Sequence, residues 1–221
     1  MLLAALLDVG QARSSVPPLL RQLGLPPDAL QVRRIARQTL SGLQCRVRAT
    51  AHEHSLQPLI ARLRQSRLPA AVRLMAGRMF ARLARAERRV HRGTAHAHEV
   101  HEIGRIDTLI AIAGCAWLLH ELRIRRVFAG PLPLGSGWTR AEEGLLPNPG
   151  PAVLELLLGF PVVMTRLRAE LVTPTAAAIL STVAQPWPAG QSLVIARVGY
   201  GAGTRRIAGV PGLLRACLIH Y

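Results

Sequence analysis

The sequence predicts an α/β protein, a mixed layered α/β domain with glycine-rich loops where strands end. Half of the 221 residues are hydrophobic, which is typical of a chain with a buried core. Segments with a helical spacing of apolar residues follow segments in which apolar and polar residues alternate. Glycines gather directly after several of the alternating segments. No low-complexity linker divides the chain, so we expect residues 1–221 to form a single domain.

The first half of the chain is predicted to be mainly helical. Four segments have helical spacing or composition: residues 1–9, which Gly10 ends as a C-cap, residues 15–30, in short pieces broken by prolines, residues 56–68 and residues 69–92. Between them, the alternation in residues 43–54 predicts a strand with Leu43, Cys45 and Val47 on one face.

Residues 69–92 show the clearest helical period and carry two different faces. The apolar face consists of Val72, Met75, Met79, Leu83, Ala86 and Val90. A separate stripe consists of Arg78, Arg82, Arg85, Arg89 and Arg92. Glu87 is the one acidic residue of the segment that could offset these charges locally. The stripe is either a solvated helix face, as charge runs usually are, or an anion-binding surface.

The second half alternates between helices and strands. Residues 107–122 are almost wholly apolar and predict a buried helix. The further elements are a strand running into a Pro/Gly loop in residues 124–135, a helix starting with proline in residues 150–160, a strand end, a Thr-Pro-Thr turn and a helix in residues 170–183, a strand entering a glycine-rich loop in residues 191–204, and a last strand in residues 212–221.

The chain is strongly basic, with a formal net charge of +16, and all 28 basic residues are arginine. A base-composition bias of the encoding genome explains the missing lysine, although guanidinium groups also suit phosphate recognition. The charge attracts nucleotides or nucleic acid whatever its origin. Aromatic residues make up only 4% of the chain, so stacking on single strands is not expected and nucleic acid is not a predicted partner.

The three cysteines, Cys45, Cys115 and Cys217, are widely spaced and form no CxxC pair. This pattern argues against a zinc ribbon and against a disulfide scaffold, and it favours a reducing cytoplasm. The apolar start lacks the basic region of a signal peptide. No stretch approaches the roughly 18 apolar residues of a membrane span, so no membrane partner is expected.

The stretch HAHEVHEIGRID, residues 96–107, concentrates imidazoles and carboxylates. In a helix, His98, His101 and Glu102 would converge, whereas in a strand His96, His98 and Glu102 would share a face. Either arrangement brings two or three N and O donors together, a set that suits divalent Ni, Zn, Fe or Mn. The alternative is a polar loop, because the spacing is not that of an HExxH motif.

Three loops have the composition of anion-binding turns. They contain Gly135, Ser136 and Gly137 in GSG, Thr173 and Thr175 in VTPT before a helix, and Gly201, Gly203 and Arg205 in VGYGAGTRR. Backbone N–H groups at such turns can approach a phosphate closely. Each motif is weak by itself, and the alternatives are a tight turn, an ordinary helix cap and a bulged hairpin.

Four motifs occur in an order and spacing that resemble the N-terminal region of the LarC family of nickel insertion proteins. They are VHEIGRIDTLIAIAG, PLPLGSGWTRAEEGLLPNPGP, ELVTPTAAAILSTV and RVGYGAGTR, and the helical segment MFARLARAERRVH precedes them as in the family. The resemblance covers essentially the whole chain. It implies nickel insertion, by cyclometallation, into pyridinium-3,5-bisthiocarboxylate mononucleotide, which gives the nickel-pincer cofactor of lactate racemase. In that cofactor, nickel is bonded to one ring carbon and two sulfurs.

The resemblance also implies residue roles. The metal would be handled by His101, Glu102 and Asp107, with His98 beside them and His96 and Glu99 as auxiliaries. The phosphate and carboxylate groups of the substrate would be bound by Gly135, Ser136, Gly137, Thr173, Thr175, Gly201, Gly203 and Arg205.

The implied activity is that of a CTP-dependent nickel insertase or chelatase of the lyase class, with Ni(II) and with CTP and Mg²⁺ or Mn²⁺. The resemblance is to the N-terminal part of the family, and the C-terminal CTP-binding part is expected to be absent here. A separate C-terminal half is therefore an expected partner, and an apo lactate racemase-like enzyme would receive the product.

Several polar positions depart from the family pattern. Glu99 and Glu143 stand where the family has His, and Ala111 and Arg206 stand where it has Asp. The apolar framework persists around them. A non-catalytic protein that binds nickel or a nucleotide, or an inactive remnant of the family, is therefore the alternative.

Overall fold

The computed structural model describes residues 1–48, 56–91, 105–141, 144–187 and 190–220. The helices are α1 Leu2–Val9, the 3-10 turn η1 Arg13–Ser15, α2 Val16–Gln22, α3 Leu56–Gln65, α4 Ala70–Val90, α5 Ile106–Glu121, α6 Pro151–Leu156 and α7 Pro174–Val183. The strands are β1 Leu30–Arg37, β2 Leu40–Val47, β3 Val127–Ala129, β4 Leu132–Leu134, β5 Trp138–Ala141, β6 Gly144–Pro147, β7 Val162–Met164, β8 Ala184–Pro186, β9 Val194–Ala202 and β10 Leu213–His220. The α/β class predicted from the sequence is confirmed.

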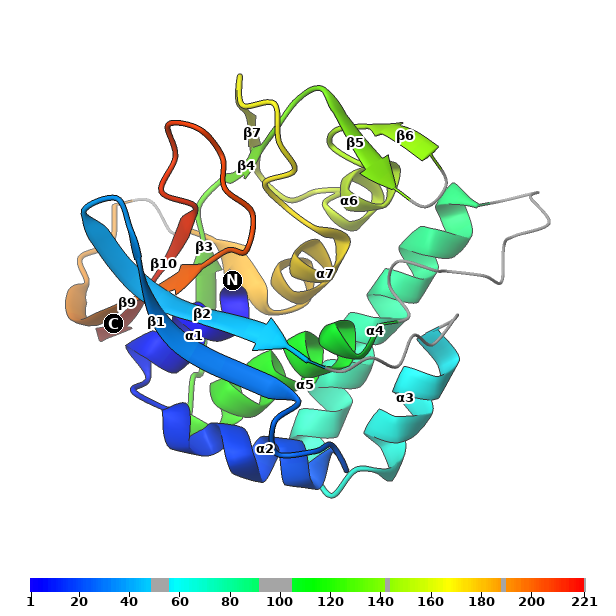
Figure 1. Ribbon diagram of the computed structural model, residues 1–221, viewed down its shortest axis with the longest axis vertical. Helices are drawn as coiled ribbons and strands as arrows, with labels where there is room; N and C mark the ends of the chain where they lie inside the picture. The colour runs from blue at the N-terminus through cyan, green and yellow to red at the C-terminus, as the bar shows by residue number, and fades with distance from the viewer. Residues whose placement is uncertain (49–55, 92–104, 142–143, 188–189, 221) are drawn as a thin grey trace.

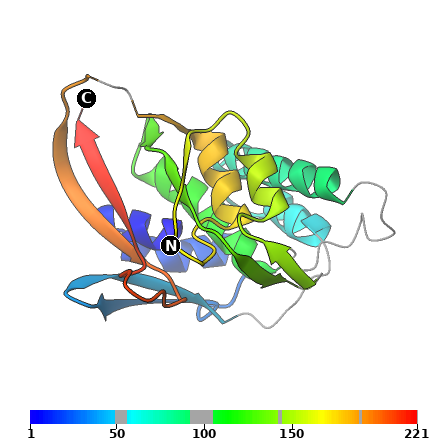
Figure 2. The same ribbon diagram turned by 90° about the horizontal axis from the view of Figure 1, so that it is seen from above.

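A four-stranded sheet in the order β1-β2-β9-β10 forms one side of the molecule, and the helices lie on the other side (Figure 1 and Figure 2). β1 pairs antiparallel with β2, and β9 pairs antiparallel with β10. These two pairs are joined by a short parallel contact, in which Leu43 lies opposite Gly201 and Gln44 opposite Ala202. Smaller pairs form between β3 and β8, β4 and β7, and β5 and β6.

Helix α1 packs directly on β9, and glycines make this possible. A Cβ atom at Gly201 would lie 2.2 Å from the carbonyl oxygen of Met1, and one at Gly199 would lie 2.2 Å from the backbone nitrogen of Val9. At the end of α1, the half-buried carboxylate of Asp8 accepts a hydrogen bond from the backbone N–H of Tyr200 at 2.8 Å. The first helix is therefore fixed to a strand near the other end of the sequence.

Helix α5 is the centre of the core and contacts α1, α3, α4 and α7. Nearly every side chain from Ile106 to Leu119 is buried, as the apolar sequence predicts. Gly114 lets α1 approach closely, because a Cβ there would lie 2.8 Å from Cδ1 of Leu3. Within the described ranges, no helix combines the length and apolar content that crossing a membrane requires.

Most predicted elements are confirmed, and two expectations are wrong. The helical pieces expected up to residue 30 end at Gln22, since Gly24 adopts a positive φ of 66° and two prolines follow. The strand end expected at residues 170–172 is absent, and the nearby strand is β7. Gly10 ends α1 as predicted, but in a right-handed conformation, and the left-handed residue is Gln11.

Candidate functional site

The predicted metal-binding residues lie in a stretch between α4 and α5 that the structure describes only at its two ends. Outside the described residues lie His96, His98, Glu99, His101 and Glu102. Asp107 is described and lies just beyond this stretch, in the first turn of α5. The structure of this candidate metal site is therefore described only at the side chains on either side of residues 92–104.

Asp107 presents a carboxylate to solvent, with 52% of its side chain exposed. Its Oδ1 accepts a hydrogen bond from the backbone N–H of Thr108 at 3.0 Å and lies 3.8 Å from Nε of Arg105. This carboxylate can supply one oxygen ligand, although the described part of the chain contains no group of three or more metal-binding side chains.

An acid and an imidazole also lie at the opposite end of that stretch, where the sequence analysis assigned no site. Glu87 and His91 are one turn apart at the end of α4, and Nε2 of His91 lies 3.4 Å from Oε2 of Glu87. Glu87 is buried. The Glu-x-x-x-His spacing in ERRVH is the signal that predicts such a pair. Both side chains make further contacts.

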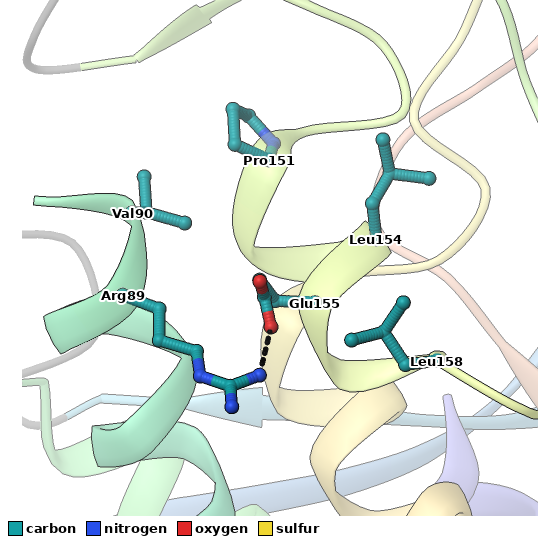
Figure 3. A pocket seen from close by; sticks show the side chains of 6 residues that line it. All are labelled: Arg89, Val90, Pro151, Leu154, Glu155 and Leu158. Atoms are coloured by element: carbon teal, nitrogen blue, oxygen red, sulfur yellow. Dashed lines mark hydrogen bonds and ion pairs between the residues drawn. The ribbon is translucent and has the colours of Figure 1, made fainter.

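The arginine stripe of α4 ties neighbouring helices together. Arg82 donates a hydrogen bond to the carbonyl oxygen of Ser181 in α7, and Arg89 forms an ion pair of 2.9 Å with Glu155 of α6. Figure 3 shows this ion pair in an open groove of about 330 Å³ whose other lining residues are Val90, Pro151, Leu154 and Leu158. Because Glu155 neutralises Arg89, the groove has little net charge with which to attract an anion.

The GSG loop between β4 and β5 is held in place by its neighbours. A Cβ at Gly135 would lie 1.8 Å from the carbonyl oxygen of Ala169, so only glycine fits there. The N–H of Ser136 donates to the carbonyl oxygen of Leu167 at 2.8 Å. The side-chain amide of Asn148 donates hydrogen bonds to the carbonyl oxygens of Ser136 and Ala169. The backbone N–H of Asn148 donates to the carbonyl oxygen of Gly137. The backbone donor of Ser136 is thus already used within the protein.

Thr173 and Thr175 lie at the start of α7. Oγ1 of Thr173 accepts a hydrogen bond from the N–H of Ala176 at 3.3 Å, which is the geometry of an N-cap. Thr173 is exposed and Thr175 is half-buried. The cap predicted at Thr173 is therefore confirmed, and an anion role for either threonine stays a prediction.

The glycines of VGYGAGTRR serve packing. Gly201 faces α1, as described above, and the N–H of Gly203 donates a hydrogen bond to the carbonyl oxygen of Gly212 at 3.0 Å. The carbonyl oxygen of Gly203 accepts hydrogen bonds from Arg37 and Gln44. This network closes the loop between β9 and β10 on itself.

The three predicted phosphate-binding loops, which are far apart in the sequence, meet at residues 165–173. Leu167 binds Ser136 of the first loop, and Glu170 forms an ion pair of 2.5 Å with Arg205 of the third. Thr173 of the second loop ends the same segment. The fold thus brings the three loops together, while their phosphate-binding role stays a prediction.

The chain is an α/β protein in which the predicted phosphate-binding loops border one segment, and comparison with known proteins specifies the family. Residues 1–220 match the family model described as nickel insertion protein, and the chain belongs to this family. No solved structure matches this chain.

Two relatives illustrate the similarity. The pyridinium-3,5-bisthiocarboxylic acid mononucleotide nickel insertion protein of Desulfitobacterium hafniense (strain DSM 10664 / DCB-2) is 35% identical over 218 residues, which are 97% of this chain and 54% of the relative. The protein of the same name from Geobacillus kaustophilus (strain HTA426) is 32% identical over 231 residues, which are 99% of this chain and 56% of the relative. The chain thus spans about half the length of these relatives.

Proposed function

We propose that this chain is the nickel-holding part of a nickel insertase that acts on pyridinium-3,5-bisthiocarboxylic acid mononucleotide. The observation that carries the proposal is the family match over residues 1–220. The name of the Desulfitobacterium relative supplies the substrate. The meeting of three predicted phosphate-binding loops at residues 165–173 supports it, because a mononucleotide presents both a phosphate and carboxylate-type groups.

The chemistry of the donors agrees with this role. Nickel is the cargo, and His98, His101, Glu102 and Asp107 would hold it by nitrogen and oxygen. Such ligands release Ni(II) to the softer sulfurs of the two thiocarboxylates. Forming the nickel–carbon bond breaks one ring C–H bond and releases one proton, which an imidazole or carboxylate beside the metal can accept.

The complete reaction would need a second half. CTP and Mg²⁺ or Mn²⁺ are assigned to that half, and an apo lactate racemase-like enzyme would receive the finished cofactor. We propose a cytoplasmic location, which the free thiols of Cys45, Cys115 and Cys217 support.

Reconstitution tests the proposal. The chain is loaded with Ni(II) and mixed with the mononucleotide, CTP, Mg²⁺ and the remaining half of the Desulfitobacterium relative, and activation of apo lactate racemase is measured. We expect activation, with the full-length relative as the positive control. Activation by the full-length relative but none by the reconstituted mixture would contradict the proposal.

Nickel binding tests the metal residues separately. The triple variant His101→Ala, Glu102→Ala, Asp107→Ala is expected to bind Ni(II) at least about tenfold more weakly in calorimetry, since three donors are lost. The matched control is His120→Ala combined with Asp28→Ala, which removes an exposed imidazole and an exposed carboxylate elsewhere. Equal affinities of the triple variant and the parent chain would exclude this metal site.

A nickel or nucleotide carrier without catalysis is the second candidate. The substitutions at Glu99, Ala111, Glu143 and Arg206 favour it, since they replace family polar residues. It predicts Ni(II) binding that depends on His101 and Glu102, together with no racemase activation in the reconstituted mixture.

A further inference from the structure

The far ends of β9 and β10 form a two-stranded ribbon that the helices do not cover. We call residues 194–198 of β9 and 216–220 of β10 the exposed ribbon. All five residues of the β9 part are exposed, and Val194, Ile195 and Val198 are 65%, 57% and 45% accessible. Figure 2 shows both strands on the rim of the molecule, with this end away from the helices.

The strand register gathers the apolar side chains on one face of the exposed ribbon. Cys217 lies opposite Val198, and Ile219 lies opposite Ile195. Directly opposed residues share a face, and Cys217 and Ile219 are two residues apart in β10. Ile195 and Val198 are three residues apart in β9, but the register shifts between Leu218 and Ile219, and this bulge brings Ile195 onto the face of Val198. Gly199 faces α1, which places its neighbour Val198 on the face away from α1.

Both edges of the exposed ribbon also lack a strand neighbour within the described part of the chain. β10 is an edge strand, and β9 pairs with β2 only at Gly201 and Ala202. Backbone N–H and C=O groups on both sides can therefore accept another strand. An apolar face between two open edges is a surface that proteins normally cover.

We propose that the exposed ribbon is the docking surface for the half of the nickel insertion proteins that lies outside the match. The chain aligns over 97% of its own length and covers 54% of the Desulfitobacterium relative, so nearly half of that relative lies outside the match. If both halves serve one substrate, they must touch. This inference rests on the second half proposed above, but its test measures association and not nickel insertion.

The ribbon fits this occupant better than the other exposed apolar residues do. Val163 of β7 is 48% accessible, but β7 and its partner β4 pair over only three residues, and Leu154 and Leu158 line the groove beside Arg89. Among these surfaces, the exposed ribbon has the longest open strand edges beside a β-branched apolar face. The partner strand would add to an edge of the ribbon, and its apolar side chains would cover Ile195 and Val198.

Copurification tests this inference. The full chain is co-expressed with the part of the Desulfitobacterium relative that lies outside the match, and the complex is measured by size-exclusion chromatography with light scattering. We expect a one-to-one complex that the double variant Ile195→Glu, Val198→Glu weakens at least about tenfold. The control Val163→Glu places the same charge on a strand residue of similar exposure and should leave the complex intact.

Alkylation of Cys217 gives a second readout in the unsubstituted chain. Because Cys217 lies opposite Val198, we expect the partner to slow its reaction with N-ethylmaleimide at least about tenfold. The proposal is overturned if no complex forms, if the ribbon variant binds as well as the control, or if Cys217 stays equally reactive. It is also overturned if the chain alone forms a dimer that Val198→Glu dissociates, which would assign the ribbon to a second copy.

Discussion

At Gly199 and Gly201, the backbone of α1 occupies the place where a side chain would begin. Replacing Gly199 by Ala puts a Cβ 2.2 Å from the nitrogen of Val9. We expect Gly199→Ala to lower the free energy of unfolding by about 1–3 kcal/mol or more, the usual cost of overpacking. Urea denaturation measures this change.

The opposite sign is expected for Gly77→Ala, which serves as the control. Gly77 lies inside α4, and a Cβ there would meet nothing within 4 Å. Alanine favours the helix by roughly 0.5–1 kcal/mol over glycine, so this variant should be more stable. A Gly199→Ala variant as stable as the parent would contradict the close packing of α1 on β9.

The three cysteines differ strongly in their expected reactivity. Burial raises the pKa of the Cys45 thiol to about 11 and that of the Cys115 thiol to about 12. Since the thiolate reacts, a raised pKa leaves roughly a thousandth or less of each thiol reactive at pH 8. Cys217 is exposed. Mass spectrometry after brief alkylation at pH 8 should find label at Cys217 and almost none at the other two, and rapid labelling of Cys115 would contradict its burial.

Some residue roles could not be predicted from the sequence, because the same sequence motif can bind a phosphate or allow close packing. The glycines of VGYGAG match a phosphate loop, but Gly199 and Gly201 are required by the helix that lies on them. That helix is about 190 positions away in the chain, so no local pattern reveals it. Glu87 in the same way looked like a surface charge, and only the packing of α4 shows that it is buried.

At the scale of elements, mutation at the start of α7 can show whether the hydroxyl of Thr173 caps the helix or binds a ligand. Thr173→Ala removes the acceptor for the N–H of Ala176 and should cost about 1 kcal/mol of stability. Thr173→Ser keeps the oxygen and should restore most of it. Thermal denaturation measures both. A Thr173→Ala variant of unchanged stability would argue that the hydroxyl serves something other than the helix.

The elements that could be predicted are those with a strong local signal. α4 and α5 show it in their apolar spacing or content, and α7 in its Thr-Pro start. β7 has only three residues and exists because it pairs with β4 about 30 positions earlier. β1 carries three arginines and becomes a strand through its partner β2. Pairing of this kind is decided by the fold and not by the segment.

At the scale of the whole molecule, the fold class and the order of the loops were accessible from the sequence, while their meeting point was not. Residues 165–173 were expected to contain a strand end, and they instead connect the GSG loop with Arg205. The metal residues His98, His101 and Glu102 lie outside the described residues, so their role stays a prediction that the nickel-binding experiment decides.

The contact between Asp8 and Tyr200, 192 positions apart, also has a consequence for folding during synthesis. At a synthesis rate of about 5–20 residues per second, α1 leaves the ribosome roughly 10–40 s before β9 exists. During that interval Ala5 and Val9, the buried residues of α1 that lie against β9, have no strand to cover them. The sheet therefore closes only after about 200 residues have been synthesised, and until then the first helix is a natural client for chaperones that shield nascent apolar segments.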